Sequence, residues 1–295
     1  MNEMSTNAPQ PTAEKKPAKK KKKRAGKILI YAALIFIIWW ANNYLLFITS
    51  EQISSSKINN EIKLAVISDQ HASTGFFAIS NEAIIKKINK IEPDVVCVLG
   101  DMHSNDATPE EKDISLNLMT DIIAEGYKMY FVLGEHDDRT NEYVSKMEEK
   151  GVNVLDQRSE TIKIKDTQVT FYGISNAYFS EYFDLRNEFT LNPDTYNILL
   201  AHIPMFEEYE QFGADLTLCA DTHGGIIQVP FLGPAYYNNE ILPEVFGNEE
   251  EVYDKGLFEN NSGYMFITSG IGNSPVAARF NNFPEVAEIT ITPDK

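Results

Sequence analysis

Cysteine is scarce in this sequence: its 295 residues include two, Cys97 and Cys219. Each lies inside a short apolar run, where a free thiol usually packs as a small buried hydrophobic side chain. Neither belongs to a Cys-x-x-Cys pair, so the sequence supports neither a cysteine zinc site nor a disulfide framework. Metal chemistry would therefore have to rest on carboxylates and histidines.

Basic residues are also few beyond the N-terminus. Residues 1–27 hold nine Lys and Arg against two Glu, a net charge of +7, which leaves −24 on the remainder of a chain whose total is −17. Such an acidic body argues against a nucleic-acid partner, because unspecific nucleic-acid binding needs basic surface. It also repels an anionic substrate unless bound cations offset the charge.

The N-terminal region predicts a single-pass membrane anchor. Residues 28–48 contain no charged side chain, and as a helix they would span about 31 Å, which matches the hydrocarbon core of a bilayer. The lysine-rich residues 1–27 should form a disordered cytoplasmic tail, which places residues 61–295, the folded domain, outside the cell membrane. We expect residues 49–60 to be a polar linker. A cleaved secretory signal and a buried core helix are the alternatives for the apolar segment.

From residue 61 onward, apolar runs alternate with segments of helical periodicity. We expect strands over residues 63–68, 94–99, 129–133, 161–165, 168–172, 197–201, 215–220, 264–269 and 286–291, and helices over residues 81–91, 109–125 and 141–150. The order βαβαβα in the first half is typical of a parallel sheet covered by helices, and the second half is richer in strands.

Every histidine of the chain lies where an expected strand ends. The five histidines and their acidic neighbours are Asp69/His71, Asp101/His103, Glu135/His136/Asp137, His202 and Asp221/His223. A single histidine at a strand end is usually a hydrogen-bonded loop residue, but five of five is hard to ascribe to chance. Because α/β sheets bind ligands beyond the carboxyl ends of their strands, these side chains should converge on one site.

Carboxylate and imidazole ligands without thiolate suit Mn, Fe, Zn or Mg. Two such ions about 3.5–4 Å apart clamp both oxygens of an in-line displacement at phosphorus and lower the pKa of a bridging water. The pattern therefore predicts two divalent metal ions and hydrolysis of a phosphoester.

The order of these motifs resembles that of the calcineurin-like metallophosphoesterases. The family pattern D-x-H, G-D, G-N-H-[DE], H and G-H-x-H matches, in order, Asp69-Gln70-His71, Gly100-Asp101, Gly134-Glu135-His136-Asp137, His202 and Ala220-Asp221-Thr222-His223. The resemblance covers about residues 61–292 and implies a four-layer αββα sandwich of two mixed sheets flanked by helices. Residues 268–274, 278–280 and 283–285 are also similar to a bacterial membrane-associated subgroup that includes UDP-2,3-diacylglucosamine pyrophosphatases and cell-envelope phosphoesterases.

Position by position, the resemblance implies a role for each motif residue. Asp69, His71 and His223 would hold the first metal, Asp101 would bridge the two, and Glu135, His202 and Asp221 would hold the second. His136 would be the general acid that protonates the leaving oxygen as a metal-bound hydroxide attacks phosphorus, a role worth ~10²–10⁴-fold in rate. The implied activity is that of a membrane-anchored, metal-dependent phosphoesterase acting on a phosphomonoester, a phosphodiester or a lipid-linked pyrophosphate.

Three positions depart from the family pattern. Glu135 stands where the family has Asn, and Asp221 stands where it has the first His of G-H-x-H. Both are carboxylates at the second metal, so we expect a harder and more anionic site that favours Mn²⁺, Mg²⁺ or Fe over Zn²⁺. Ser104 replaces an Asp that supports the general acid in many relatives, and Asp106 or Asp137 could compensate. The alternative function is a degenerate relative that binds metal and phosphate ligands with little or no turnover.

Substrate contacts leave weaker marks in the sequence. Arg139 and Arg279 could each bind a phosphate with two hydrogen bonds, or each form a structural ion pair. His103 has no role in the family pattern and is interpreted as a hydrogen-bonded loop residue. The aromatic segment 230–238 could form an apolar lip for a lipid-linked substrate, or it could pack into the core.

Overall fold

The computed structural model describes residues 19–175, 184–237, 239–247, 251–274 and 276–294, and the chain divides into the units Met1–Ile38 and Trp39–Lys295. The described part of the first unit belongs to helix α1, Lys19–Tyr44, whose side chains are exposed from residue 26 to residue 38. Among the described residues, one helix, Gly26–Tyr44, is long and apolar enough to cross a membrane, a test that a core helix or a signal sequence also passes.

The observed limits of this helix differ from the expected ones at both ends. Residues 19–27 are helical rather than disordered, and residues 1–18 of the expected tail lie outside the described residues. Lysine and alanine are good helix formers, so the apolar helix extends back into the lysine run. At its other end α1 stops at Tyr44, and the last residues of the expected span, 47 and 48, belong to a strand.

The expected linker also differs from the observed structure. Residues Phe47–Ser55 form strand β1, which runs parallel to β16, Glu285–Pro293, in continuous register. The strand is mostly polar and lies at the edge of its sheet, and its residue Ile53 is buried. Pairing of the backbone with a long neighbour decides the structure of such a segment, and the polar sequence does not reveal that pairing.

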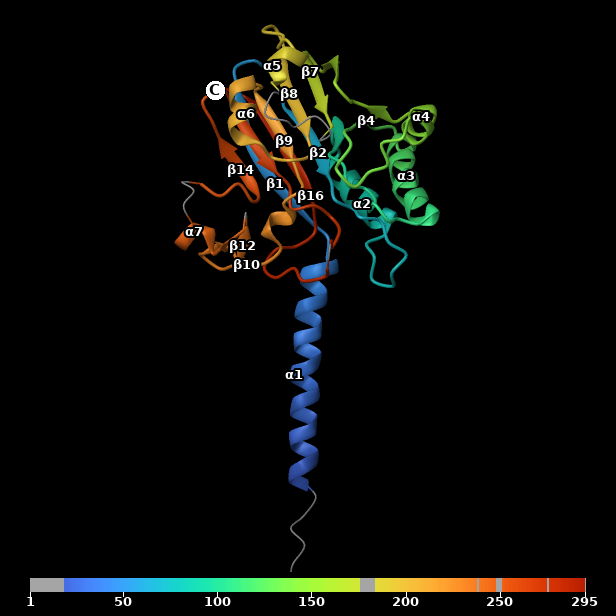
Figure 1. The fold of residues 1–295 in the computed structure, drawn as a ribbon, viewed down its shortest axis with the longest axis vertical. Coiled ribbons are helices and arrows are strands. Elements are labelled where there is room, and N and C mark those ends of the chain that lie inside the picture. The colour runs from blue at the N-terminus through green and yellow to red at the C-terminus, as the bar shows by residue number, and fades with distance from the viewer. Residues whose placement is uncertain (1–18, 176–183, 238, 248–250, 275, 295) are drawn as a thin grey trace, which may run out of the picture. The chain divides into compact units, whose positions relative to one another are not determined.

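The second unit contains two six-stranded mixed sheets (Figure 1). The first sheet comprises β1, β2 (Ile62–Ile67), β3 (Val95–Val98), β4 (Lys128–Phe131), β5 (Asn153–Val154) and β16, in the order β1-β16-β2-β3-β4-β5. The second comprises β6 (Arg158–Ile164), β7 (Thr167–Ile174), β8 (Tyr196–Ala201), β9 (Leu216–Cys219), β14 (Gly256–Glu259) and β15 (Tyr264–Ile267), in the order β14-β15-β9-β8-β7-β6. The strands β2 to β5 run parallel to one another, as do β7, β8, β9 and β15.

Helices cover the outer face of each sheet. The first sheet packs on α2 (Asn81–Ile91), α3 (Pro109–Ala124) and α4 (Asn141–Glu149), and the second on α5 (Leu185–Glu188) and α6 (Phe206–Phe212). A third apolar cluster lies between the sheets, where residues such as Val66 and Val95 meet Phe171 and Ile198. Successive side chains of a strand point to opposite faces of its sheet, so each sheet contributes to the core between the sheets and to the core under its own helices.

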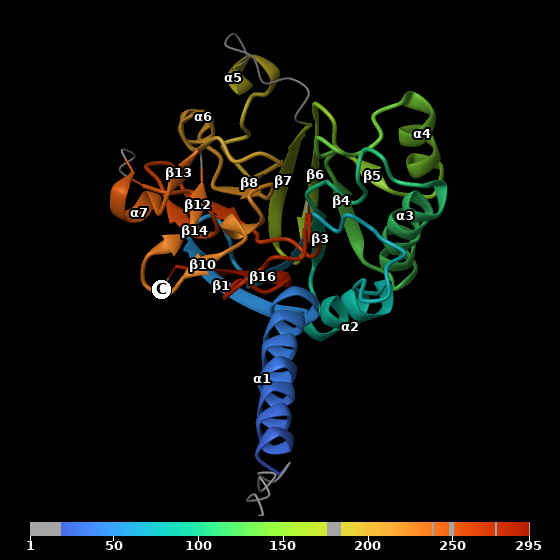
Figure 2. The ribbon, with the colours of Figure 1, turned by 60° about the horizontal axis from the view of Figure 1, so that its bottom comes forward.

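Local signals define the helix starts. Ser80 caps α2, and Thr108 forms a capping box with Glu111 at the start of α3. Two small antiparallel strand pairs, β10 (Gln228–Val229) with β11 (Gly233–Pro234) and β12 (Tyr236–Tyr237) with β13 (Glu240–Ile241), precede α7 (Pro243–Phe246). These lie on the side of the sheets away from α3 and α4 (Figure 2). The predicted fold, two mixed sheets flanked by helices and preceded by an apolar helix, is confirmed.

Candidate metal centre

The candidate residues follow the carboxyl ends of five strands. In the first sheet, Asp69 and His71 follow β2, Asp101 follows β3, and Glu135 and His136 follow β4; in the second sheet, His202 follows β8, and Asp221 and His223 follow β9. The carboxyl ends of the parallel strands in both sheets meet at one edge of the sandwich. Side chains far apart in the sequence are thereby brought within a few ångströms of one another.

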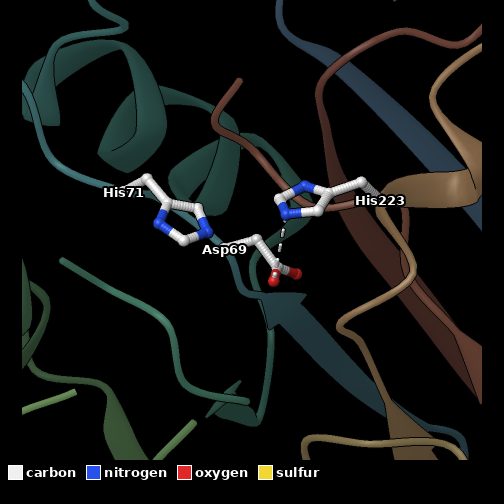
Figure 3. Close-up of side chains that lie close together, drawn as sticks. All are labelled: Asp69, His71 and His223. Atoms are coloured by element: carbon white, nitrogen blue, oxygen red, sulfur yellow. Dashed lines mark ion pairs between the residues drawn. The ribbon is translucent and has the colours of Figure 1, made fainter. Parts of the chain in front are cut away.

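Asp69, His71 and His223 form the first group (Figure 3). One ligand atom from each lies within 4.8 Å of the others. Nε2 of His223 is 3.9 Å from Oδ1 of Asp69, and the rings of His71 and His223 stack with their centroids 5.3 Å apart. Ligands about 2.0–2.2 Å from one ion are separated by distances of this order, so the three side chains could share a cation.

The second group joins Asp69 to Asp101 and His202. Nε2 of His202 lies 3.3 Å from Oδ2 of Asp101, 3.9 Å from Oδ1 of Asp69 and 3.7 Å from Oδ1 of Asp221. Nδ1 of His202 is 2.6 Å from the carbonyl oxygen of Leu99, so it carries the proton and Nε2 is left to face the carboxylates. Such a backbone hydrogen bond is the usual way in which a metal-ligating imidazole is oriented.

The third group contains Asp101, Glu135 and His136. Nε2 of His136 is 3.8 Å from Oδ2 of Asp101 and 3.4 Å from Oε1 of Glu135. Asp101 therefore belongs to two groups, as Asp69 does, and the three groups form one continuous cluster. Glu135 is half-exposed, unlike the buried Asp101.

The backbone is unusual at these positions. Asp69, His71, Asp101, Asp221 and His223 all have positive φ values, between 40° and 69°. Residues other than glycine rarely adopt this left-handed conformation, which costs of order 1–3 kcal/mol at each position. Such strain persists where the surrounding structure enforces it, and it is concentrated at functional sites.

Several atoms of the cluster are buried without a hydrogen-bond partner among the described residues. They are Oδ1 and Oδ2 of Asp69, Nε2 of His71, Nε2 of His202 and Nδ1 of His223. Buried polar atoms almost always have a partner, so unpaired polar atoms gathered in one place call for a ligand. Hard oxygen and imidazole donors are those that divalent cations bind, and the residues present thus fit the metal ions that the motifs predict.

The pKa values in the cluster point the same way. Burial raises the pKa of Asp69 to about 7, with Asp101 and Asp221 adding to the rise and His202 opposing it. Burial alone would lower the pKa of His202, but the nearby carboxylates of Asp101 and Asp69 outweigh it and raise the pKa to about 10. Burial lowers the pKa of His71 to about 4. Crowded carboxylates that hold protons are groups from which a divalent cation displaces them on binding.

The loops after β3 and β4 are held together by a buried carboxylate. Oδ2 of Asp137 accepts hydrogen bonds from the backbone N–H of Asp101 at 2.7 Å and of Gly134 at 2.8 Å, and Oδ1 accepts one from Met102 at 2.9 Å. The two loops approach so closely that a Cβ at Gly134 would overlap the side chain of Asp101. The sequence left open whether Asp137 supports the general acid; its observed contacts are with the backbone of these loops.

His136 has a different partner, which the sequence did not indicate. Nδ2 of Asn105 is 2.8 Å from Nδ1 of His136. The amide donates to Nδ1, so the proton of the neutral ring is on Nε2, the atom that faces Asp101. Ser104 instead contacts the first group, with Oγ 3.1 Å from Nδ1 of His71. An Asn in a polar loop carries no spacing signal, so nothing in the pattern could have identified Asn105.

The remaining candidates make local contacts. Nη2 of Arg139 donates to the carbonyl oxygen of Gly134 at 2.9 Å. Arg279 is buried and donates to the carbonyl oxygens of Ser269 and Gly272, both at 2.7 Å, while its Nη1 has no hydrogen-bond partner among the described residues. Phosphate binding by either arginine stays a prediction. His103 is buried, and its Nε2 accepts from a backbone N–H at 3.3 Å, which agrees with a hydrogen-bonded loop histidine.

The chain is similar in sequence to a known bacterial protein. Over 251 residues the chain is 26% identical to the uncharacterized metallophosphoesterase YkuE of Bacillus subtilis (strain 168), and the match covers 82% of this chain and 84% of that protein. No family model matches the chain. The similarity supports the metallophosphoesterase family that the order of the motifs indicates.

A comparison with solved structures gives alignments of low sequence identity, each with a TM-score below 0.5. NAD nucleotidase of Haemophilus influenzae aligns with a TM-score of 0.41 at 18% identity, over 70% of this chain and 50% of that one, so this chain spans half the length of the nucleotidase. The protein TT1561 of Thermus thermophilus aligns with a TM-score of 0.45 at 10% identity, over 71% of this chain and 89% of that one. GAP50, the anchor in the inner membrane complex of Plasmodium, aligns with a TM-score of 0.42 at 10% identity, over 76% of this chain and 77% of that one.

Proposed function

We propose that this chain is a metal-dependent phosphoesterase that binds two divalent metal ions. The observation that carries the proposal is the convergence of Asp69, Asp101, His202 and their neighbours, from five strand ends of two sheets, into one cluster with buried unpaired ligand atoms. The similarity to a metallophosphoesterase over most of both chains supports it. Mixed carboxylate and imidazole sites of this kind suit Mn²⁺, Fe²⁺, Mg²⁺ or Zn²⁺.

In this proposal Asp69, His71 and His223 hold one ion, Glu135, His202 and Asp221 hold the other, and Asp101 touches both. Bound ions would polarise the phosphoryl oxygens and lower the pKa of water. They would also offset the negative charge of the domain, which otherwise repels a phosphate. The carboxylates Glu135 and Asp221 favour the harder ions Mn²⁺, Mg²⁺ and Fe²⁺ at the second position.

His136 is placed to donate a proton. Its Nδ1 accepts from Asn105, which keeps the proton on Nε2, and Nε2 faces the carboxylate cluster. A leaving oxygen bound beside the cluster would therefore meet an N–H group rather than a lone pair. About a third of the His136 side chain is exposed, so the ring remains accessible to a substrate.

The N-terminal helix supports an anchored enzyme. The apolar segment Gly26–Tyr44 is long enough to span a bilayer, and the lysine run before it favours a cytoplasmic N-terminus with the domain outside. An enzyme held there would act on a phosphomonoester, phosphodiester or lipid-linked pyrophosphate of the cell envelope, as in the subgroup that residues 268–274, 278–280 and 283–285 resemble.

The test is hydrolysis of p-nitrophenyl phosphate and bis-p-nitrophenyl phosphate by the full chain in detergent, with Mn²⁺, Fe²⁺, Mg²⁺ and Zn²⁺ supplied in turn. We expect turnover with at least one metal, lost in Asp101→Asn and kept in the matched surface variant Asp121→Asn. Stoichiometric metal binding without turnover on either ester would contradict the proposal and favour the degenerate metal-binding relative, which the substitutions at Glu135 and Asp221 suggest.

A further inference from the structure

A cavity of about 350 Å³ opens beside the metal centre, between the segment 70–79 and residues 271–273, 276 and 277. His71 is part of its wall and is also a member of the first ligand group. A phosphate bound at that group would therefore lie at the edge of the cavity, and whatever is attached to the phosphate could extend into it.

The cavity has a largely apolar entrance. Phe76 and Val276, which line it, are 95% and 59% exposed. Ile114, from α3, lies on another part of the wall. Exposed large apolar side chains at the entrance of a cavity are typical of a site for an apolar ligand rather than of ordinary surface.

The last turn of α1 forms one side of the cavity. Tyr44 lines it, with its ring 5.4 Å from that of Phe77, and Trp39 packs on Phe77 at 6.3 Å. Trp39 also donates from Nε1 to the carbonyl oxygen of Ala277 at 2.8 Å, which fixes this turn to the second wall of the cavity. If Gly26–Tyr44 crosses a bilayer, Trp39 and Tyr44 lie at the interface where such aromatic side chains are enriched, and the cavity opens there.

Two buried acceptors complete the wall. Oε1 of Gln70 and Oδ1 of Asn273 have no hydrogen-bond partner among the described residues, and Gln70 is 6% exposed. Their orientation is fixed, because Nε2 of Gln70 donates to Asn81 at 2.9 Å and Nδ2 of Asn273 donates to the backbone of Asn43 at 2.7 Å. A ligand that carries a hydroxyl or amide N–H close to its phosphate would satisfy them, and a bare hydrocarbon would not.

We propose that this cavity binds the hydrocarbon chain of a phosphoester lipid drawn from the adjacent bilayer, with the phosphate at Asp69, His71 and His223. The inference rests on the proposed function for the fate of the phosphate. It goes further because it assigns the substrate class, an amphiphile with a hydrogen-bond donor between its chain and its phosphate. It also names Gln70 and Asn273 as the residues that would accept hydrogen bonds from that donor group.

The test uses the full chain in lipid nanodiscs that contain lysophosphatidic acid, whose free glycerol hydroxyl lies between chain and phosphate, with a photoactivatable diazirine at the end of its acyl chain. We expect covalent labelling at Ile114, mapped by mass spectrometry, because a chain inside the cavity reaches α3. Ala78→Trp places an indole in the cavity and should abolish this label, whereas Ala124→Trp, on the exposed face of α3 outside the cavity, should keep it. Labels at Phe76 and Val276 alone, unchanged in Ala78→Trp, would show mere contact with the bilayer and overturn the proposal.

Turnover separates this inference from the proposed function. Each methylene excluded from the cavity weakens binding about fourfold, so Ala78→Trp should lower the ratio of lysophosphatidic acid to p-nitrophenyl phosphate hydrolysis at least about tenfold relative to Ala124→Trp. Hydrolysis of p-nitrophenyl phosphate without the Ile114 label would overturn the proposal that the cavity binds a lipid chain, while the proposed phosphoesterase activity would stand. The Ile114 label without hydrolysis of either ester would uphold the lipid cavity while the proposed function fails.

Discussion

Replacing Asp137 by alanine should loosen the metal centre without removing a ligand. The carboxylate is 5% exposed and accepts three backbone hydrogen bonds, from Asp101, Met102 and Gly134, all between 2.7 and 2.9 Å. These bonds join the loop after β3 to the loop after β4. Alanine would leave the three buried N–H groups without an acceptor.

The expected loss of stability follows from those donors. A buried unsatisfied N–H costs ~1–3 kcal/mol, so three of them cost ~3–9 kcal/mol. Removal of the carboxylate offsets part of this loss of stability. Burial and the nearby Asp101 raise the pKa of Asp137, so the folded protein disfavours its ionised form. We expect a net destabilisation of ~3–5 kcal/mol, which lowers the melting temperature by roughly 6–20 °C in a domain of this size.

The assay is thermal unfolding followed by circular dichroism, together with titration of Mn²⁺. Asp137→Asn keeps one carboxyl-like oxygen, and should lose about a third to a half as much stability as Asp137→Ala, since two of the three donors are retained. Asp113→Ala removes an exposed carboxylate whose partner is Lys146 at 3.3 Å, and should change stability by less than ~1 kcal/mol. Equal damage from Asp137→Ala and Asp137→Asn would refute the reasoning, because the charge and not the accepted hydrogen bonds would then matter.

Three further outcomes are expected. Asn105→Ala should lower kcat about tenfold or more with little change in KM and should alter the pH profile, because His136 loses the bond that fixes its tautomer; an unchanged pH profile would assign Asn105 to structure alone. Metal binding should release protons and tighten about tenfold per pH unit for each proton displaced, since Asp101 and other carboxylates raise the pKa of His202 to about 10 in the free protein and the ligating imidazole must be neutral; calorimetry in two buffers that shows no proton release would contradict this. Asp221→His should shift the metal preference toward Zn²⁺ in competition assays, and an unaltered preference would exclude Asp221 from the second site.

Much of the fold could be predicted because its strands are apolar and their ends are marked. β2, β3 and β4 each consist of a short buried run followed at once by a polar turn, so their limits were expected within a few residues. β1 was missed because it lies at a sheet edge, and its polar residues face solvent while its backbone pairs with β16. Whether an edge segment is a strand or a linker depends on that distant partner, which composition does not encode.

In the candidate site, too, some residues could be predicted from the sequence and others could not. Histidines and acids at strand ends are visible in the sequence, and their convergence follows from the rule that ligands bind beyond the carboxyl ends of strands. Asn105 was missed because its contact with His136 depends on how two loops fold over each other. Arg279 donates to backbone carbonyls of Ser269 and Gly272, contacts that the sequence did not indicate, and its role as a phosphate ligand stays a prediction because Nη1 has no hydrogen-bond partner among the described residues. A charged residue in a loop has no pattern that distinguishes these uses.

Elemental analysis of the purified full chain after reconstitution with Mn²⁺ tests the central claim most directly. Two ions per chain in the native sequence, and at most one in Asp101→Asn with its fold intact by circular dichroism, are the results expected from a shared carboxylate between two ligand groups. Less than one ion per chain in the native sequence, at metal concentrations that saturate ordinary carboxylate and imidazole sites, would contradict the claim that the five strand ends form a dinuclear metal centre.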